Sequence, residues 1–390
     1  MPPAVREPLL TARFLRIWSF GFFTFFTLFQ LLPTIPFRIV ALGGTRAQAG
    51  LFLAIYTYAC AFSAPITGAV ADHVGRRRLL RLAASGFVVF SLLYGLIDSL
   101  PILLAVAVVH GIVWSAILSS SAAIITEIIP ESRRTEGIAY WGMASTAAVS
   151  IAPLVGLALY AVGWLTLTAE LVVTSLIMVV LSLFVRAGQQ RSTAPFPALR
   201  SLVDWRVMVL SLSLFAIAFG YGGITSYVAM MAVERNIDPP SLFFTVFAIA
   251  IFGTRLVTGP LGDRIGARRL FFPSVAVIPP ALVLLAVSDS TLEVGLAAAL
   301  YGTGFGGAYP AFATYVLGRT SAARRGATFG SIVWAFDTGI GTGSLTIGWI
   351  IDRYGYTDAM IAAAAISLAS IPVFLVAARV LPVQDGVASS

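Results

Sequence analysis

A ten-residue segment occurs twice in this chain, once in each half. The first copy, residues 68–77, reads GAVADHVGRR, and the second, residues 259–268, reads GPLGDRIGAR. The copies lie 191 residues apart in a chain of 390 residues. Two other pairs keep this spacing: Arg133-Arg134 with Arg324-Arg325, and His110-Gly111 with Tyr301-Gly302. The repeat predicts two structurally equivalent halves.

The repeated unit is predicted to lie in a lipid bilayer. Hydrophobic residues make up 58% of the chain and charged residues only 11%, which excludes a soluble globular domain. Apolar runs of roughly 20 residues, long enough to cross about 30 Å of hydrocarbon as helices, recur between polar breaks. There are twelve: 14–36, 47–71, 79–98, 101–127, 137–160, 163–185, 205–232, 240–262, 270–288, 292–317, 327–350 and 358–380. We therefore predict an all-α membrane protein with twelve transmembrane helices in two pseudo-symmetric six-helix bundles.

One polar segment separates the bundles. Residues 187–204 are rich in proline, glutamine, serine and threonine and are too few to form another domain. We expect a cytoplasmic linker there, between an N-terminal bundle (1–186) and a C-terminal bundle (205–390). The first residues lack the short apolar core and cleavage site of a secretory signal, so the first span is expected to remain as an anchor.

Arginine predicts the orientation in the membrane. All 25 basic residues are arginine, and short cytoplasmic loops collect such residues. Arginines precede the first span and follow spans two, four, six, eight and ten, whereas the other side holds few: Arg38, Arg46, Arg235 and Arg353. We expect both termini to be cytoplasmic and the protein to reside in the cell inner membrane.

Several classes of function are disfavoured by the composition. The net charge of +8 is dispersed over helix ends, so no nucleic-acid partner is expected. Cys60 is the only cysteine, which excludes an intrachain disulfide and favours simple packing. His73 and His110 match no metal-ligand spacing, so we expect neither a metal nor a cofactor. Ser119-Ser120-Ser121 has no histidine on a matching face, and an enzyme is not expected.

The doubled loop, the twelve spans and the central linker together resemble the major facilitator superfamily of transporters, over essentially the whole chain. Gly142 and the run Ala152-Pro153-Leu154-Val155-Gly156 in the fifth span are similar to the antiporter motif of bacterial efflux-type members, including drug:proton antiporters and arabinose efflux permeases. Here Ala152 replaces the first glycine of that motif. The resemblance implies transport by alternating access and a monomer.

The first loop copy predicts a conformational latch. Gly68 and Gly75 permit close helix approach and a tight turn, and Asp72 at a helix end can accept hydrogen bonds from the free backbone donors of a neighbouring helix N-terminus. The resemblance implies that this neighbour is the eleventh span, which starts near Gly326.

The resemblance also implies that Arg76 pairs with Glu127 while the cytoplasmic side is shut. The second loop copy adds four residues to the latch: Gly259, Asp263, Gly266 and Arg268. Alternatively, the arginines serve only to orient the protein.

Few ionisable residues lie at membrane depth, and each is a functional candidate because burying charge in hydrocarbon is costly. Asp337 and His110 are candidates for proton coupling, since a desolvated carboxylate or an imidazole can load and release a proton. Asp337 is alternatively a fixed hydrogen-bond partner, and His110 a helix-to-helix hydrogen bond. Arg255 is expected to be structural. Ala107 stands where family members often have an arginine, so a role for that arginine is excluded here.

The central cavity is expected, by resemblance, between spans one, four, seven and ten, helped by two, five, eight and eleven. Its candidate lining is Phe23, Thr27, Gln30, Trp114, Tyr140, Met143, Phe219, Tyr221, Thr225, Tyr227, Tyr301, Tyr309 and Trp334. Aromatic rings with scattered hydroxyls suit a large apolar or amphipathic ligand. The same residues can instead pack helices or face lipid.

These features predict a secondary active transporter that exchanges protons for an exported hydrophobic or amphipathic small molecule. An importer or facilitator of a neutral solute is the alternative, because the cavity is nearly uncharged. A membrane receptor or enzyme is the remaining class, and the lack of a large soluble domain or a clustered catalytic group argues against it. The expected partners are thus a small-molecule substrate, the proton and the lipid bilayer.

Overall fold

The computed structural model describes residues 8–185, 204–320 and 324–380, and these residues form helices and connecting turns without a β-strand. The N-terminal half contains α1 (Ala12–Leu31), α2 (Ile35–Ala41), α3 (Arg46–Val74), α4 (Arg76–Leu96), α5 (Leu100–Ile128), a short 3-10 turn (Glu131–Arg133), α6 (Arg134–Val162) and α7 (Trp164–Phe184). The C-terminal half contains α8 (Trp205–Glu234), α9 (Leu242–Ile265), α10 (Ala267–Ala276), α11 (Ile278–Val287), α12 (Thr291–Leu317) and α13 (Arg325–Val380).

The thirteen helices of the described residues make twelve spans, as predicted. Helices α1 and α2 form one span with a break beside Pro33, and α10 and α11 form another with a break before Pro279, because proline lacks the N–H that continues a helix. Conversely, α13 holds two spans, which part at Gly355 with φ +85°. Only a residue without a Cβ adopts that conformation readily.

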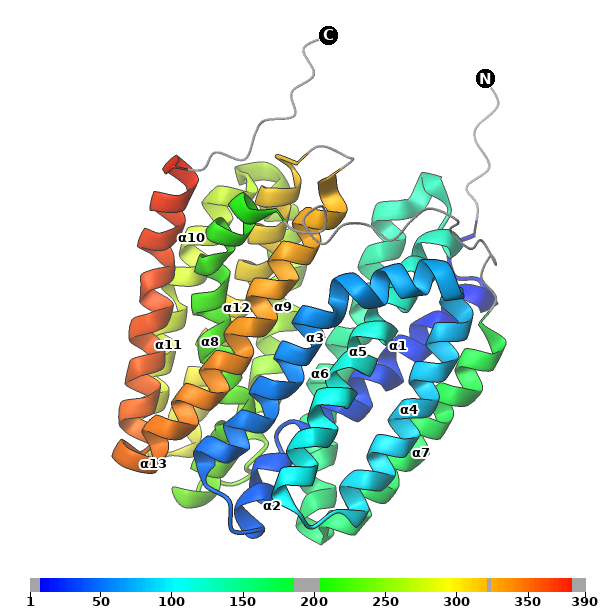
Figure 1. Cartoon of the computed structure of the whole chain (residues 1–390). Helices are drawn as coiled ribbons and strands as arrows, with labels where there is room; N and C mark the ends of the chain where they lie inside the picture. The colour runs from blue at the N-terminus through cyan, green and yellow to red at the C-terminus, as the bar shows by residue number, and fades with distance from the viewer. Residues whose placement is uncertain (1–7, 186–203, 321–323, 381–390) are drawn as a thin grey trace, which may run out of the picture.

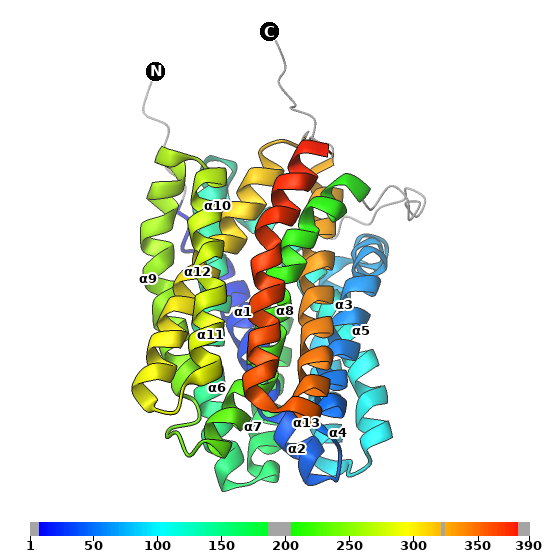
Figure 2. The same ribbon diagram turned by 90° about the vertical axis from the view of Figure 1, so that its left-hand side faces the viewer.

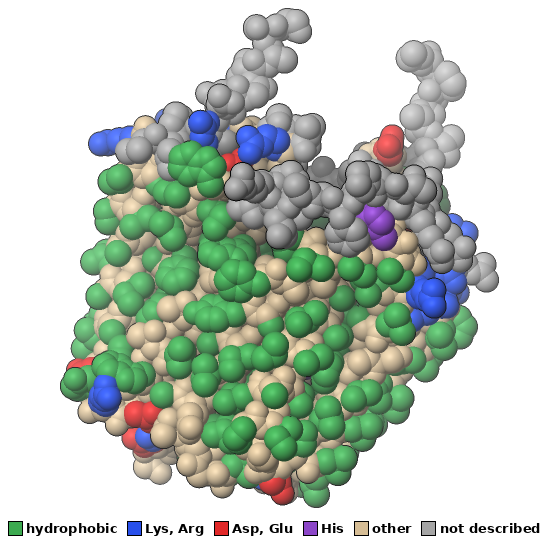
Figure 3. All heavy atoms as spheres, in the orientation of Figure 1, with side chains coloured by type: hydrophobic (Ala, Val, Ile, Leu, Met, Phe, Trp, Pro, Cys, Tyr) green, Lys and Arg blue, Asp and Glu red, His purple; other side chains and the backbone are tan. Residues whose placement is uncertain are grey.

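The two halves stand side by side, blue to green in the first and green to red in the second (Figure 1). We call the face where α1 begins and α13 ends the terminal face, and the face where α3 begins the opposite face. The view turned by 90° keeps the same two faces (Figure 2). Hydrophobic side chains cover the flank between the faces, and charged ones gather towards the rims (Figure 3). Such a belt is what a bilayer requires of a multi-pass protein.

Three helices end with the same four-residue pattern, an aspartate three positions before a glycine of positive φ. The pattern closes α3 at Asp72 and Gly75 (φ +102°) and α9 at Asp263 and Gly266 (φ +87°). The third copy, Asp352-Arg353-Tyr354-Gly355, closes the first span of α13. Since that span runs from the terminal face to the opposite face, the third aspartate lies at the other end of the molecule from the first two.

Candidate functional site

The two halves meet along α3 and α13, and this seam is closed at the opposite face. The Asp352 carboxylate accepts hydrogen bonds from the backbone N–H of Arg46 at 3.1 Å and of Ala47 at 2.8 Å. Both donors belong to the first turn of α3, where backbone N–H groups have no partner within the helix. The Arg46 guanidinium donates to Glu234 at 2.7 Å and to the Tyr356 hydroxyl at 3.2 Å. Asp352 therefore caps a helix of the other half.

Glycines allow the two helices to touch near this closed end. A Cβ added at Gly50 would lie 2.2 Å from the Ser344 carbonyl oxygen, and one added at Gly348 would lie 2.6 Å from the Arg46 carbonyl oxygen. The Tyr227 hydroxyl, predicted to line the cavity, instead donates to the Arg46 and Ser344 carbonyl oxygens at 2.6 and 3.0 Å. Tyr227 thus belongs to the closure.

The middle of the seam carries Asp337. The Cys60 thiol donates to Asp337 Oδ2 at 3.5 Å, and the Tyr58 hydroxyl, two residues earlier on α3, contacts Thr342 Oγ1 at 2.7 Å. The ring of Phe62 then packs edge-on against Trp334, with centroids 5.7 Å apart. Asp337 therefore lies on the dividing surface between the halves.

Towards the terminal face the same seam is open. Beyond Phe62, and with His73 set aside, no hydrogen bond, ion pair or ring contact joins α3 to α13 among the residues whose side chains are described. Phe62 is 62% exposed and Ile66 is 51% exposed, although both belong to a helix of the interface. An added Cβ at Gly68 would meet nothing within 4 Å. The halves are therefore apart at this end.

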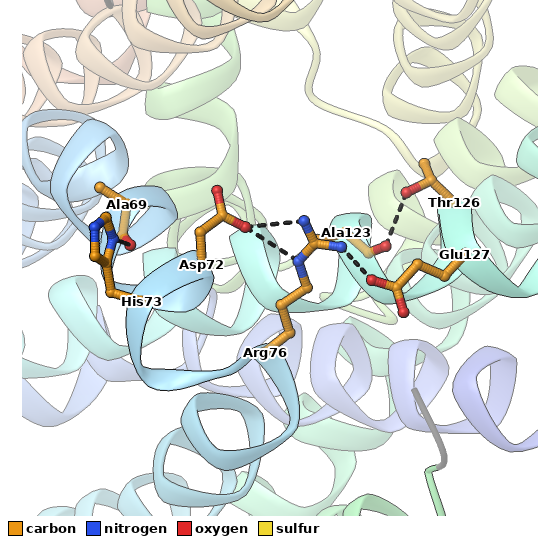
Figure 4. Close-up of polar contacts among 7 residues, drawn as sticks. All are labelled: Ala69, Asp72, His73, Arg76, Ala123, Thr126 and Glu127. Atoms are coloured by element: carbon orange, nitrogen blue, oxygen red, sulfur yellow. Dashed lines mark hydrogen bonds and ion pairs between the residues drawn. The ribbon is translucent and has the colours of Figure 1, made fainter. Parts of the chain in front are cut away.

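The loop after α3 forms an ionic cluster within the N-terminal half (Figure 4). Arg76 donates from Nε and Nη2 to Asp72 Oδ1 at 3.1 and 2.9 Å, and its third nitrogen contacts Glu127 of α5. The pairing of Arg76 with Glu127 thus exists while the terminal side is open, so it does not depend on a shut terminal side as the resemblance implies.

The second loop copy is described only in part. Gly266 has the expected positive φ and Arg268 is exposed. The side-chain surroundings of Gly259, Asp263 and Gly326 lie outside what the structure describes. Gly326 is the expected partner of Asp72.

His110 lies inside the N-terminal half and away from the seam. It is 3% exposed, its Nδ1 is 3.1 Å from the Tyr94 hydroxyl, and the rings of Tyr56, Phe87 and Phe90 surround it at 4.6 to 5.0 Å. Its Nε2 is buried without a hydrogen-bond partner in the described part of the chain. His110 therefore lies behind α3, against the ring of its Tyr56, whereas Asp337 meets α3 from the other half.

The C-terminal half presents a set of stacked rings, which we call the aromatic wall. Tyr221 stacks on Phe305 at 4.6 Å and on Phe247 at 6.0 Å, and Phe336 contacts Tyr309 at 5.1 Å. Tyr301 joins the wall through Phe247 and Phe305, at 5.8 and 5.9 Å. Tyr221, Tyr301 and Tyr309 were predicted to line the cavity, but Tyr221 and Tyr301 are buried, at 9% and 1% exposure, and Tyr309 is partly exposed. Thr225 donates to the Tyr221 carbonyl at 2.8 Å.

Other predicted lining residues are turned into the N-terminal half. Thr27 contacts Thr174 Oγ1 at 3.0 Å, and Gln30 is 0% exposed. The Gln30 carbonyl oxygen would lie 2.7 Å from a Cβ at Gly156, so this motif glycine lets α1 and α6 touch. Trp114 is 6% exposed.

The fifth-span motif otherwise leaves room on α6. Tyr140 and Met143 are 42% and 44% exposed, and a Cβ at Gly142 would meet nothing within 4 Å. Pro153 lies within the helix.

Sequence reasoning missed three residues. Asp352 and Arg46 build the closed end of the seam, and the third copy of the aspartate–glycine pattern was the available signal. Glu170 lies within the apolar α7, and its Oε2 is buried without a hydrogen-bond partner among the described residues. A lone carboxylate in an apolar run is itself a signal, and it was overlooked.

Comparisons with known proteins agree with this architecture. The family model described as the Major Facilitator Superfamily matches residues 17–333 and 210–389. The MFS-type transporter YhhS of Escherichia coli strain K12 is 23% identical over 380 residues, covering 94% of each chain. A bacterial homologue of the human lysosomal transporter Spinster matches with TM-score 0.77 and 16% identity, over 98% of this chain and 100% of that one. A D-xylose–proton symporter matches with TM-score 0.77 and 14% identity, over 93% and 96%.

Proposed function

The chain belongs to the major facilitator superfamily, and on that premise we propose that it is a secondary transporter that exports a hydrophobic or amphipathic small molecule in exchange for protons. The observation that carries the proposal is the unequal seam between α3 and α13, closed by Asp352 at the opposite face and open beyond Phe62 at the terminal face. A site reached from one side only is one half of an alternating-access cycle.

The sequence also contains the groups needed for the opposite conformation of the cycle, in which the seam is closed at the terminal face. The first span of α13 runs antiparallel to α3, so each of the two carries an aspartate at the end of the seam where the other begins. Asp352 caps α3 in this conformation. We propose that rocking of the halves breaks that cap and brings Asp72 to the first turn of α13. Each conformation would then be held by one charge-assisted cap at a time.

We assign proton coupling to Asp337 ahead of His110. Asp337 contacts Cys60 of the other half, so its surroundings must change when the seam opens. His110 is enclosed by aromatic rings of its own half, so its surroundings would change less when the halves move. From the arginine-rich loops we place the terminal face in the cytoplasm, with the protein as a monomer in the cell inner membrane.

Proteoliposomes that enclose a pH-sensitive dye test this proposal, with aromatic cations, anions and neutral solutes as probes. Asp337→Asn should abolish proton movement driven by a probe gradient but retain probe counterflow, because a neutral amide still permits rocking. His110→Gln should keep both activities, and so should the control Asp358→Asn at an exposed rim position. Uphill transport that persists in Asp337→Asn would remove the coupling residue.

A facilitator or importer of a neutral solute is the second candidate. It is favoured by the scarcity of charge between the halves, where Asp337 of α13 and Arg255 of α9 are the acidic and basic side chains at mid-depth among the described residues. Such a protein would give equal counterflow with and without a proton gradient, whereas an exchanger responds to the gradient.

A further inference from the structure

Arg255 is a cation at membrane depth that forms no ion pair with any carboxylate whose side chain the structure describes. It lies about 20 Å along α9 from Leu242 and about 15 Å from Ile265 at the helical rise. The residue is exposed, and among the described residues its guanidinium makes one hydrogen bond, to the hydroxyl of Thr146, and no ion pair. An unpaired charge at this depth is costly and is retained for function more readily than for packing.

The contact with Thr146 prepares Arg255 for an anion. The Thr146 hydroxyl donates to the Gly142 carbonyl at 3.1 Å, so its oxygen offers a lone pair to Arg255. Guanidinium has five N–H donors in a planar fork, which matches the paired oxygens of a carboxylate, sulfonate or phosphate. Thr146 belongs to α6 and Arg255 to α9, so an anion bound here would sit between the two halves.

Arg255 adjoins the aromatic wall, whose partly exposed rings are Phe305, Tyr309 and Phe336. Phe247, Ile251 and Arg255 are spaced four residues apart and so share one side of α9. Phe247 contacts Tyr221 and Phe305 of the wall at 6.0 and 5.8 Å. Tyr309 of α12, which packs on Phe336, lies within electrostatic range of Arg255.

From this juxtaposition we infer that the transported molecule is an organic anion with a planar aromatic part. Its anionic group binds Arg255 beside Thr146, and its ring packs against the aromatic wall. The inference rests on the proposed function, because it takes the surface between the halves as the transport site. Asp337 also lies within electrostatic range of Tyr309. An anion is therefore attracted by Arg255 and repelled by Asp337. A cation is repelled by Arg255 and attracted by Asp337.

Equilibrium binding to the full chain in lipid nanodiscs tests the inference with three probes of one shape: 2-naphthalenesulfonate, the neutral 2-naphthalenesulfonamide and (2-naphthylmethyl)trimethylammonium. The sulfonate should bind tightest. Arg255→Gln should lower the affinity for the sulfonate by about 10- to 100-fold, the range for loss of hydrogen bonds to a charged group. The affinity for the sulfonamide should not change. Arg255→Lys should retain part of the preference. Arg353→Gln is the control, since that cation stacks on Trp349 at 4.1 Å near the opposite face.

Asp337→Asn provides a second measurement, in which the affinity for the sulfonate should not fall. The inference can therefore still be tested if Arg255→Gln folds poorly. The Asp337→Asn variant should bind the sulfonate at least as tightly as the parent chain, because a nearby negative charge is lost. Tighter binding of the cation or the sulfonamide by the parent chain would overturn the inference, and so would weaker sulfonate binding in Asp337→Asn.

Binding and flux separate this inference from the proposed function. Sulfonate binding that needs Arg255 in a protein that moves no probe across liposomes would support the anion site and refute transport. Proton-coupled flux of the cation alone would support transport and refute the anion site.

Discussion

The two ends of the α3–α13 seam carry similar groups in different states. At the closed end, Asp352 accepts two backbone N–H bonds from α3, and Gly348, four residues before it, lets the helices touch. At the open end, Asp72 and Gly68 occupy the matching places, but Asp72 is held by Arg76 of its own half and Gly68 faces free space. This comparison indicates that residues able to close the seam are present at both ends. The relative tilt of the two halves determines which end is closed.

The cap at the closed end must also be weak enough to break in each cycle. A hydrogen bond to a charged group contributes about 1.5–3 kcal/mol, and two of them give a few kcal/mol. Two conformations that differ by a few kcal/mol exchange readily when a ligand or a proton favours one of them. A closure built from a large apolar interface would hold the protein in one state.

The largest effect is expected from adding a methyl group at each end. Gly50→Ala would place a Cβ 2.2 Å from the Ser344 carbonyl oxygen, so the closed end must separate, at a cost of about 1–3 kcal/mol or more. Gly68→Ala has free space and should leave the seam unchanged. Alkylation of Cys60, which is 2% exposed, reports the separation and should be faster by about tenfold or more in Gly50→Ala alone. Equal rates in the two variants would contradict the comparison.

A smaller effect is expected from the aspartates. Asp352→Ala removes the cap on α3, which typically costs about 0.5–2 kcal/mol, so the open population at the opposite face should rise by about 2- to 30-fold. Spin labels at the exposed positions Val40 and Leu292, one in each half, would report it as a longer distance. Asp72→Ala should not lengthen that distance, because Asp72 is paired within its own half. A longer distance in Asp72→Ala would show that the two ends are not independent.

The smallest effect is expected from Tyr58→Phe in the middle of the seam. The change removes the 2.7 Å contact with Thr342, whose hydroxyl keeps its bond to the Thr338 carbonyl at 2.7 Å. Since a neutral hydrogen bond contributes about 0.5–1.5 kcal/mol, Cys60 alkylation should change by less than about tenfold. A change as large as that of Gly50→Ala would place the decisive contact in the middle and not at the end.

Much of the fold followed from the sequence because a bilayer permits few arrangements. A chain that crosses lipid must satisfy its backbone hydrogen bonds within each helix, so every long apolar run becomes a span. The breaks at Pro33 and Gly355 follow from backbone chemistry, although the first was not foreseen within its span. The pairing of Arg76 with Glu127 was reached through a family resemblance and is present in the structure.

The site was less predictable, because apolar residues surround a membrane helix on all sides and periodicity does not tell which side faces a neighbour. Thr27, Gln30 and His110 were placed on the correct helices, yet all three turn into the N-terminal half. Arg255 was expected to be structural, and its contact with Thr146 of the other half depends on where α6 and α9 meet.

The twelve spans, the two related halves and most of the charged groups that enter the membrane could be read from the amino-acid sequence, because hydrocarbon constrains length and charge wherever a helix lies. Only the tertiary structure decided which of those groups share a surface. Asp352 meets the start of α3, and Asp337 meets Cys60, through the rotation and tilt of helices more than 270 positions apart in the chain. That geometry is set by side-chain packing between the halves, which no local pattern of residues encodes.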